Sequence, residues 1–524
     1  MKPFTAPLDD ILFCLDHVAG AARLPGWDPD FARELGTHFA TFAEGEIAPL
    51  DEPGDRQGCQ LIDGRVQMPD GFDRVYAHYA ENGWPGLTAP EAYGGQGLDA
   101  LTLAVTSEIY SGACHSLQMV SGLVPGAVRT LLRFGTEDQK TAYIPMLASG
   151  ECLATMCLTE PGAGSDLSGI QCKAVQDAQG WTISGEKIFI SGGDQNVSDK
   201  ILHLVLARTG DDNIRGLSLF LCRSEKADNT RNHVSVTRIE EKMGLHASPT
   251  CQLLFDNAEA ELIGEQGRGL NAMFTMMNHA RLDVALQGVA HAARAWDIAS
   301  AYAAQRMQGR TPEGQTATLA DHADVRRMLD EIDRLALGGR SMAHLAYVTL
   351  EAGDDPDLVE FLTPVTKVYC SEAGIRAAEI GMQVLGGYGY LQEYRLEQTY
   401  RDARITAIYD GANGIHARVL ATRLLNSAPA EAFDRFVEAD GRENEAVRHC
   451  HDLWRTARQR ITGQSDPTPY AHNFMKLSAE TLLLCIWHRM NTVADRHPDP
   501  ARISTIVEQG FSHSAAFAPA YAHS

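Results

Sequence analysis

The sequence that decides the fold is Gln383-Val-Leu-Gly-Gly-Tyr-Gly-Tyr390, which Ile408-Tyr409-Asp410-Gly411 follows further along the chain. The first stretch is a glycine turn, and glycine lets a main chain approach a bound cofactor closely. The second stretch places one carboxylate, Asp410, behind an apolar run, where loss of solvation raises the pKa of a carboxyl group. Such a group suits removal of a carbon-bound proton near neutral pH. An Asp-Gly pair is also a favoured hairpin turn, so these residues taken alone leave a purely structural role open.

Two earlier stretches have the residue types of a ring-binding site. One is Leu158-Thr-Glu-Pro-Gly-Ala-Gly-Ser-Asp166, which combines hydroxyls with glycines and can lie against a flat, polar-edged ring or an anion. The other is Gly185-Glu-Lys-Ile-Phe-Ile-Ser-Gly-Gly193, in which a strand ends with an aromatic ring and a hydroxyl close together. Taken singly, each stretch is also compatible with an ordinary turn, the second after a buried phenylalanine.

The bulk composition predicts a soluble globular protein of two to four structural units. The chain has 524 residues, of which 44% are hydrophobic and 22% charged. The net charge of −23 argues against a protein that binds nucleic acid or an anionic membrane surface. The 11 cysteines are scattered without metal-ligand spacing, which is typical of reduced thiols. We expect no signal peptide and no transmembrane segment.

Hydrophobic periodicity divides the chain into helical regions around one β region. We expect a surface loop at residues 51–70, which are rich in Gly, Pro, Asp and Gln. The remaining expectations are helices at 8–24 and 27–50, helical pattern at 73–154, short strands within 171–260, helices at 270–426, and a last helical stretch after Pro429 that ends in a weakly patterned tail.

Several signatures of other enzyme classes are absent from the sequence. The β region lacks βαβ alternation, and Gly162-Ala-Gly164 is not followed by the third glycine of a Rossmann fingerprint. The chain also lacks GxSxG, HExxH and Walker A sequences. These absences argue against hydrolase, zinc-protease and nucleoside-triphosphatase functions.

Taken together and in this order, the motifs resemble the flavin-dependent acyl-CoA dehydrogenase family over roughly residues 70–426. The two ends of the chain are similar to the larger bacterial branch, which includes enzymes for 3-methylmercaptopropionyl-CoA and fatty acyl-CoA. The resemblance implies an α+β fold. Its parts are an N-terminal helical extension (1–50), an N-terminal α-helical domain (51–155), a middle β-barrel domain (156–265), a C-terminal four-helix-bundle domain (266–428) and additional C-terminal helices (429–524).

The resemblance also implies the site residues. Phe189 and Ser191 stand where the family usually has Trp and Thr beside the flavin, and Arg306 matches an arginine that reaches the FAD pyrophosphate of a neighbouring subunit. The implied FAD-binding residues are Met156, Leu158, Thr159, Gly164, Ser165, Phe189, Ser191, Arg306, Gln383, Gly386 and Gly387. The implied substrate-binding residues are Ser165, Arg281 and Gly411, and no metal site is expected.

Asp410 is the expected catalytic base and is also a departure from the family, which usually has glutamate there. In the implied reaction, an acyl-CoA thioester is desaturated as Asp410 takes the α-proton and a β-hydride moves to flavin N5. Aspartate is one methylene shorter, and catalysis falls steeply when a group is displaced by roughly 1 Å. Either the backbone or the substrate shifts to compensate for the shorter side chain, or the reaction is slowed, or the chemistry has changed. Ala412 replaces a family threonine, and Ala280 offers no alternative base.

The resemblance further implies a cytoplasmic oxidoreductase of fatty acid metabolism. Its implied partners are an acyl-CoA with a short, medium or thioether-type acyl group and electron-transfer flavoprotein as electron acceptor. The implied assembly is a homodimer or homotetramer, without nucleic acid or membrane. Three alternatives stay open: an acyl-CoA oxidase, a non-redox flavin-containing acyl-CoA lyase or desulfinase, and a non-catalytic flavin-holding protein. The net charge of −23 weighs against the last, because the branch concerned associates with DNA.

Overall fold

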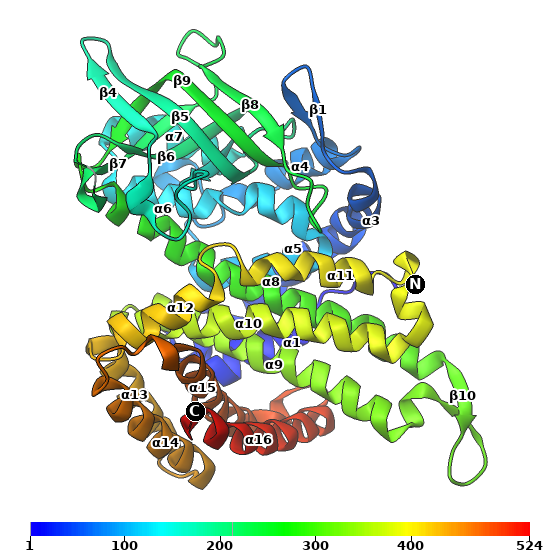
Figure 1. Ribbon diagram of the computed structural model, residues 1–524. Coiled ribbons are helices and arrows are strands. Elements are labelled where there is room, and N and C mark those ends of the chain that lie inside the picture. The colour runs from blue at the N-terminus through cyan, green and yellow to red at the C-terminus, as the bar shows by residue number, and fades with distance from the viewer. Residues whose placement is uncertain (1, 212, 524) are drawn as a thin grey trace. The chain divides into compact units, whose positions relative to one another are not determined.

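The computed structural model describes residues 2–211 and 213–523 and divides into two compact units. Unit 1 takes in the chain up to Glu44, Ala100–Ala113, and the chain from Arg281 onward. Unit 2 takes in Gly45–Asp99 and Cys114–Ala280. Each unit has its own architecture (Figure 1).

Unit 2 is built on a closed β-barrel. Its 7-stranded sheet has the order β3-β6-β4-β5-β9-β7, β8 pairs with β9, and the additional pairing of β6 with β7 closes the ring. This confirms the expected middle barrel; closure removes the exposed edges that an open sheet would have. The strands are β3 (Cys152–Cys157), β4 (Lys173–Asp177), β5 (Gly180–Ser191), β6 (Lys200–Arg208), β7 (Leu217–Arg223), β8 (Val234–Ile239) and β9 (Thr250–Ile263).

The remaining described part of unit 2 is mainly helical, and the loop expected at residues 51–70 is wrong. Helix α3 continues to Gln57, and a hairpin follows it. Helix α3 contains Pro53 and Gly54, which lower helix propensity, but Leu50 and Gly54 are buried in it. A Cβ on Gly54 would lie 2.8 Å from Phe72, so close packing overrides propensity here. The elements are α3 (Ala48–Gln57), β1 (Gln60–Ile62), β2 (Arg65–Gln67), α4 (Phe72–Glu81), α6 (Val124–Phe134) and α7 (Glu137–Ser149).

Helix α5 (Ala100–Ser121) belongs to both units. Its backbone is non-helical at Cys114 (φ −157°, ψ 95°), which is the residue where unit 2 resumes. Residues Ala100–Ala113 contribute to unit 1.

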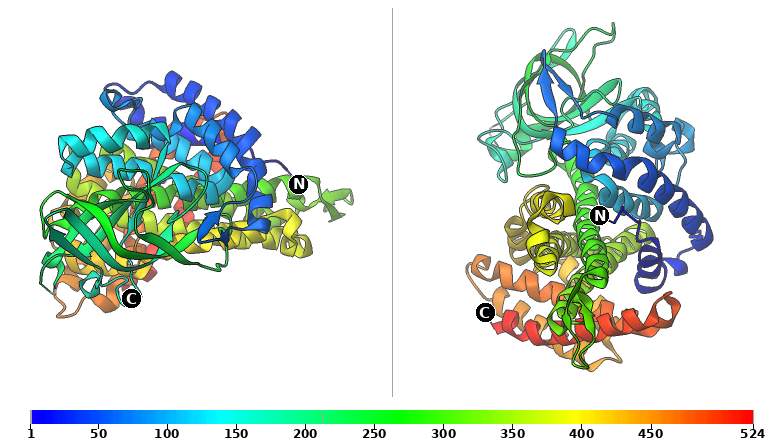
Figure 2. Two further views of the ribbon diagram at one scale, coloured as in Figure 1. Left: turned by 90° about the horizontal axis from the view of Figure 1, so that it is seen from above. Right: turned by 90° about the vertical axis from the view of Figure 1, so that its right-hand side faces the viewer.

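The centre of unit 1 is a bundle of long helices with one shared core, as expected. Small and branched residues from four helices meet there, including Ala295, Ile332, Ala377 and Leu396. The helices are α8 (Gly269–Gln305, in unit 1 from Arg281), α9 (Ala323–Ala352), α10 (Pro356–Leu385), α11 (Leu396–Ala403) and α12 (Asn413–Val419). A hairpin of β10 (Met307–Arg310) and β11 (Thr316–Thr318), which the sequence pattern did not predict, extends beyond the end of the long helices (Figures 1 and 2).

Further helices pack against this bundle. Phe361 of α10 stacks on Phe433 of α13 with ring centroids 4.3 Å apart, and Trp454 of α14 meets both rings edge-on. The weakly patterned tail is the long helix α16. These elements are α1 (Leu8–Phe13), α2 (Pro29–Phe42), α13 (Ala428–Gly441), α14 (Glu445–Thr462), α15 (Ala471–Val493) and α16 (Pro500–His523). Among the described residues, no helix has the length and apolar character needed to cross a membrane.

Candidate functional site

Asp410 lies in a tight turn between α11 and α12. Its backbone is left-handed (φ +51°), which is uncommon for a residue other than glycine. The following residue, Gly411, has φ +93°, and a Cβ there would lie 2.8 Å from Nε2 of His416. Both the backbone angle and this close approach require glycine after the aspartate. The turn therefore holds Asp410 in one defined conformation.

Two side chains hold the backbone carbonyl of Asp410. Nε of Arg281, on α8, donates to this oxygen at 3.3 Å. Nε2 of His416, on α12, lies 3.1 Å from the same oxygen. Burial, together with the charges of Arg281 and Lys367, lowers the pKa of His416 to about 3. The imidazole is therefore neutral at physiological pH, and Nε2 is the nitrogen that donates.

Lys367, on α10, holds the next carbonyl of the turn. It is 0% exposed, and its Nζ donates to the Gly411 carbonyl at 2.9 Å and to Oδ1 of Asn413 at 3.0 Å. Burial lowers its pKa to about 8, while the carboxylate of Asp410 acts in the opposite direction. A buried lysine that bonds to this turn and to the first residue of α12 fixes the turn against α10.

The pKa of Asp410 is raised above its ordinary value. Burial is the largest cause, and the nearby charges of Lys367 and Arg281 partly oppose it. The side chain is half-buried, so it remains accessible at the surface of unit 1. A raised pKa makes the carboxylate a stronger base than a solvated aspartate.

The residue before Asp410 is also held by α8. The hydroxyl of Tyr409 donates to Oε1 of Gln287 on α8. Gln287 in turn donates to Asp283 at 3.1 Å, and the hydroxyl of Ser107 on α5 donates to the same carboxylate. Residues 409 to 411 are thus anchored from three helices of unit 1.

In unit 2, Phe189 lies at an irregularity in the pairing of β5 with β9. The register shifts between Lys187 and Ile190, and Phe189 has a left-handed backbone (φ +59°). Bulges of this kind redirect a side chain. The ring is 60% exposed, and Ser191, half-buried, follows on the same strand. An exposed, conformationally fixed aromatic ring beside a hydroxyl fits a flat ring ligand.

A buried ion pair holds the first predicted flavin-binding stretch to β5. Nζ of Lys187, which is 0% exposed, donates to the carbonyl of Leu158 at 2.9 Å and to Glu160 at 2.8 Å. Glu160 also accepts bonds from the backbone N–H groups of Gln171 and Cys172. The Thr159 carbonyl accepts from the N–H of Ile188 at 2.9 Å. Residues 158–160 are thereby fixed next to the strand that carries Phe189.

The rest of this stretch is open. Met156, the penultimate residue of β3, is half-buried, and Gly164 and Ser165 are exposed. No atom lies within 4 Å of where a Cβ on Gly162 or Gly164 would stand. Space beside exposed glycine N–H groups fits a polar-edged ring, as expected for a flavin.

Arg306 and the glycine turn come together at another place in unit 1. Arg306 follows α8 directly, and its Cζ lies 5.7 Å from the ring centroid of Tyr388. Gln383, Gly386 and Gly387 are exposed at the end of α10, and a Cβ on either glycine would meet nothing within 4 Å. Arg306 is 25 residues beyond Arg281 along α8. At 1.5 Å per residue they are about 37 Å apart.

The predicted site residues therefore form separate groups. Asp410, Gly411 and Arg281 meet in unit 1, while Arg306 meets the glycine turn at the far end of the same helices. Lys367, His416 and Gln287 were not predicted. Only Lys367 had a sequence signal, since it is a lysine within the apolar run Phe361–Cys370 of a helix pattern. The residues in unit 2 are Met156, Leu158, Thr159, Gly164, Ser165, Phe189 and Ser191.

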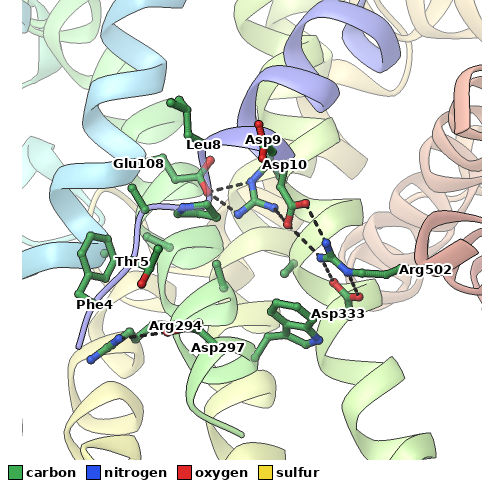
Figure 3. A pocket seen from close by; sticks show the side chains of 18 of the residues that line it. Phe4, Thr5, Leu8, Asp9, Asp10, Glu108, Arg294, Asp297, Asp333 and Arg502 are labelled. Carbon is green, nitrogen blue, oxygen red and sulfur yellow. Dashed lines mark hydrogen bonds and ion pairs between the residues drawn. The ribbon is translucent and has the colours of Figure 1, made fainter. Parts of the chain in front are cut away.

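A cavity of about 270 Å³ lies under the N-terminal segment of unit 1, away from these groups. Its wall carries a network of charges in which Asp10 bridges Arg340 and Arg502 (Figure 3). Arg502 also pairs with Asp333, and its Cζ lies 4.3 Å from the ring centroid of Trp296. The predicted site residues are not among those that line this cavity.

Comparison with protein families gives matches to three domain models. The chain matches "Acyl-CoA dehydrogenase, N-terminal domain" at residues 30–151, the middle domain at 155–258 and the C-terminal domain at 267–425. It is 38% identical over 461 residues to "3-methylmercaptopropionyl-CoA dehydrogenase" of Ruegeria pomeroyi. That alignment covers 83% of this chain and 78% of the relative.

Comparison with solved structures gives matches over most of the chain. A chain from a structure described as "Electron transferring flavoprotein of Acidaminococcus fermentans: Towards a mechanism of flavin-based electron bifurcation" is 26% identical, with a TM-score of 0.68. The match covers 77% of this chain and 100% of that chain. "Acyl-CoA Dehydrogenase complexed with FAD from Bacillus anthracis" is 22% identical with a TM-score of 0.80, covering 97% and 90%, and shows a common fold.

Proposed function

Since this chain belongs to the acyl-CoA dehydrogenase family, whose members are FAD-dependent oxidoreductases, we propose that it desaturates an acyl-CoA thioester between the α and β carbons with Asp410 as base. The observation that carries this assignment is the turn at Asp410. The carboxylate there has a raised pKa. Its position is fixed by hydrogen bonds at the Asp410 backbone carbonyl, at the Tyr409 hydroxyl and at the Gly411 carbonyl.

Asp410 removes the α-proton in this proposal. The bond between the α carbon and its hydrogen breaks, the proton passes to the carboxylate, and the electron pair is delocalised onto the thioester carbonyl. Burial raises the pKa of the carboxylate and so makes it a stronger base, while the charges of Lys367 and Arg281 act in the opposite direction and favour its ionised form. The backbone anchors fix the short aspartate side chain, so its reach is set by the turn.

The residues of unit 2 fit the family's cofactor. We propose that Phe189 lies against the isoalloxazine ring of FAD, that Ser191 and Thr159 bond its polar edge, and that the open glycines 162 and 164 admit it. When bound, FAD supplies the two-electron acceptor that desaturation requires. Met156, Leu158 and Ser165 complete this proposed contact, with Ser165 also reaching the CoA side.

We propose a homo-oligomer in which Arg306 and the glycine turn serve the cofactor of a second copy. Arg306 is about 37 Å along α8 from Arg281, which is beside Asp410. One FAD molecule cannot extend over both places in the same chain. The guanidinium of Arg306 and the exposed turn at Gln383, Gly386 and Gly387 suit a pyrophosphate.

For the substrate we propose a short, medium or thioether-type acyl group, and for the electron acceptor an electron-transfer flavoprotein. The first is supported by the Ruegeria relative, which is named for 3-methylmercaptopropionyl-CoA. The second is supported by the likeness to a chain from a structure described as an electron transferring flavoprotein. Other relatives are named "Acryloyl-CoA reductase (NADH)" and "3-(aryl)acrylate reductase". Reduction of an unsaturated acyl group, the reverse of desaturation, is therefore an alternative reaction for this fold.

The test is an anaerobic titration of the purified flavoprotein with a panel of acyl-CoA esters, followed by the loss of visible flavin absorbance. We expect one acyl class to bleach the flavin, Asp410→Ala to abolish bleaching, and Asp410→Glu to retain part of it. Retention is expected because glutamate keeps the carboxylate and restores the family residue.

Three outcomes would change the assignment. Full bleaching by Asp410→Ala would remove Asp410 as the base. Bound flavin that no saturated ester reduces would contradict dehydrogenation and favour a non-redox lyase or desulfinase. Rapid reoxidation by oxygen after reduction would favour an oxidase over a dehydrogenase.

A further inference from the structure

We propose that Lys367 is a positioning residue for the base: its ammonium group fixes the Asp410–Gly411 turn through the Gly411 carbonyl, and its charge favours the ionised form of Asp410. This inference rests on the proposed function, since it concerns the same site. Lys367 is on α10, 43 residues before Asp410, and does not belong to the residues that the motifs indicated.

The first part of the argument is the placement of the Lys367 donors. Nζ reaches the Gly411 carbonyl at 2.9 Å and Oδ1 of Asn413 at 3.0 Å. A buried donor that is removed leaves its acceptors without partners, which disfavours the conformation they hold. The turn would then be free to shift at the residue immediately after the base.

The second part is how Asn413 is itself held. Its side-chain amide donates to the hydroxyl of Ser371 at 3.1 Å and to Glu372 at 3.2 Å, both on α10. Lys476 on α15 pairs with the other oxygen of Glu372. Asn413 therefore presents Oδ1 to Lys367 in a fixed orientation, so the hydrogen bond between them is part of a larger network.

The third part is charge. The charged groups that act on Lys367 are Asp410 on the turn, Arg281 on α8 and Glu372 on α10, and Lys367 acts on His416 of α12. The two carboxylates favour the ammonium form and Arg281 disfavours it. Lys367 and Arg281 are the cations that oppose the effect of burial on Asp410. Of these cations, Lys367 is the one that is 0% exposed.

The two roles predict different results for two substitutions. Lys367→Met removes both charge and donors. The acid limb of the kcat/KM profile should then move to higher pH by about one unit, because a carboxylate that loses a nearby cation is protonated more easily. The plateau above that limb should also fall, by about 10²-fold if the turn shifts by roughly 1 Å. Lys367→Arg keeps the charge in a larger group, so the plateau should fall while the acid limb stays in place.

The measurement is the pH dependence of anaerobic flavin reduction by the best acyl-CoA, at equal flavin content for each variant. Lys173→Met, which makes the same charge change at an exposed lysine of β4, is the matched control and should keep the wild-type profile. A Lys367→Met enzyme with full flavin and the wild-type acid limb would overturn the electrostatic role. A wild-type plateau in both Lys367 variants would overturn the positioning role.

A second measurement does not depend on catalysis and also covers a variant that fails to retain flavin. Unfolding midpoints of Lys367→Met, Asp410→Asn and the double variant form a double-mutant cycle. If the two residues interact as proposed, Lys367→Met lowers the midpoint less when Asp410 is already Asn. Strict additivity would contradict the pairing. If wild-type flavin is reduced by no acyl-CoA, the proposed function fails, but this cycle still tests the contact.

Discussion

The Nε of Arg281 donates a hydrogen bond to the backbone carbonyl oxygen of Asp410 over 3.3 Å. This bond connects the long helix α8 with the turn that carries the proposed base. It differs from an ion pair because the acceptor is the main chain, and so its loss changes where the carboxylate lies. It leads to the first prediction.

Arg281→Met should reduce kcat/KM by about 10²-fold, because a displacement of roughly 1 Å at a catalytic group has that effect. Anaerobic stopped-flow measurement of flavin bleaching checks it. Arg376→Met, at a surface arginine of α10 that is 51% exposed, is the control and should keep the wild-type rate. A wild-type rate in Arg281→Met would show that His416 alone suffices to hold the carbonyl.

Gly411→Ala should impair both folding and activity. The alanine Cβ would lie 2.8 Å from Nε2 of His416 in a backbone with φ +93°. The left-handed conformation alone costs about 1–2 kcal/mol, and the clash adds to it. Gly314→Ala is a matched control, since Gly314 has φ +83° with no atom within 4 Å of the added Cβ. Urea denaturation should therefore show a larger loss for Gly411→Ala; equal losses would argue against the clash.

Asp410→Asn should stabilise the protein at neutral pH while it removes activity. The pKa of Asp410 is raised in the folded state, chiefly by burial, so the folded protein binds the proton more tightly than the unfolded chain does. Stability attributable to this group is therefore full below the unfolded pKa of about 3.9 and is lost as the pH rises through the folded value. The amide cannot ionise and avoids this loss.

Thermal unfolding midpoints from pH 4 to pH 8 check this prediction. The gain of Asp410→Asn should vanish near about pH 4. Asp466→Asn gives a control of opposite sign, because hydrogen bonds from Thr468 lower the pKa of Asp466. That variant should be slightly less stable at neutral pH. A loss of stability in Asp410→Asn at pH 8 would mean that the nearby cations outweigh burial.

Lys187→Met should destabilise unit 2 and weaken flavin retention. Removing one member of a buried pair leaves Glu160 as an uncompensated charge, which typically costs about 3–5 kcal/mol. It also releases the Leu158 carbonyl, which is next to the proposed flavin-binding Thr159. Lys200→Met removes a more exposed pair with Glu151, and its cost should stay within about 1 kcal/mol. Flavin release during thermal unfolding checks both; similar behaviour of the two variants would contradict the anchoring role of Lys187.

Arg502→Met should destabilise unit 1 by about 3–5 kcal/mol, because two buried carboxylates, Asp10 and Asp333, lose their shared partner. The stacking of Arg502 over Trp296 is lost as well. Arg327→Met is the control: its side chain is 59% exposed, and its pairs with Asp324 and Glu331 should contribute about 0–1 kcal/mol. Guanidinium denaturation measures both, and an equal effect would refute the importance of burial.

Local sequence was enough only to single out a candidate base: an apolar run, the carboxylate of Asp410 and Gly411 are adjacent in the chain. The ordered resemblance of the other motifs was needed to prefer a base over a plain turn. The hydrogen bond of Lys367 to Gly411 joins residues 44 positions apart, and no periodicity indicates such a pair. The parallel pairing of β3 with β6 was missed for the same reason. The hairpin of β10 and β11 is local, but it lies inside a region for which a helical pattern was expected.

The error at residues 51–70 has a different cause. Pro53 and Gly54 do lower the helix propensity of this segment, but tertiary packing outweighs intrinsic propensity. A Cβ on Gly54 would lie 2.8 Å from the ring of Phe72, so a residue that disfavours a helix is the one that lets this helix pack. Phe189 was predicted as the aromatic residue beside the ligand. Its left-handed backbone was not predicted, because the alternating pattern of a strand does not indicate such a conformation.

The bond between Asp10 and Arg502 joins residues 492 positions apart. Closing so long a stretch of chain is entropically costly and slow, and domains generally fold in the order in which they are synthesised. Unit 2 has all its residues by position 280, whereas the Asp10 carboxylate must wait for α16 to leave the ribosome. Unit 1 can therefore complete its charge network only after the whole chain has been synthesised, whereas every residue of unit 2 is available earlier.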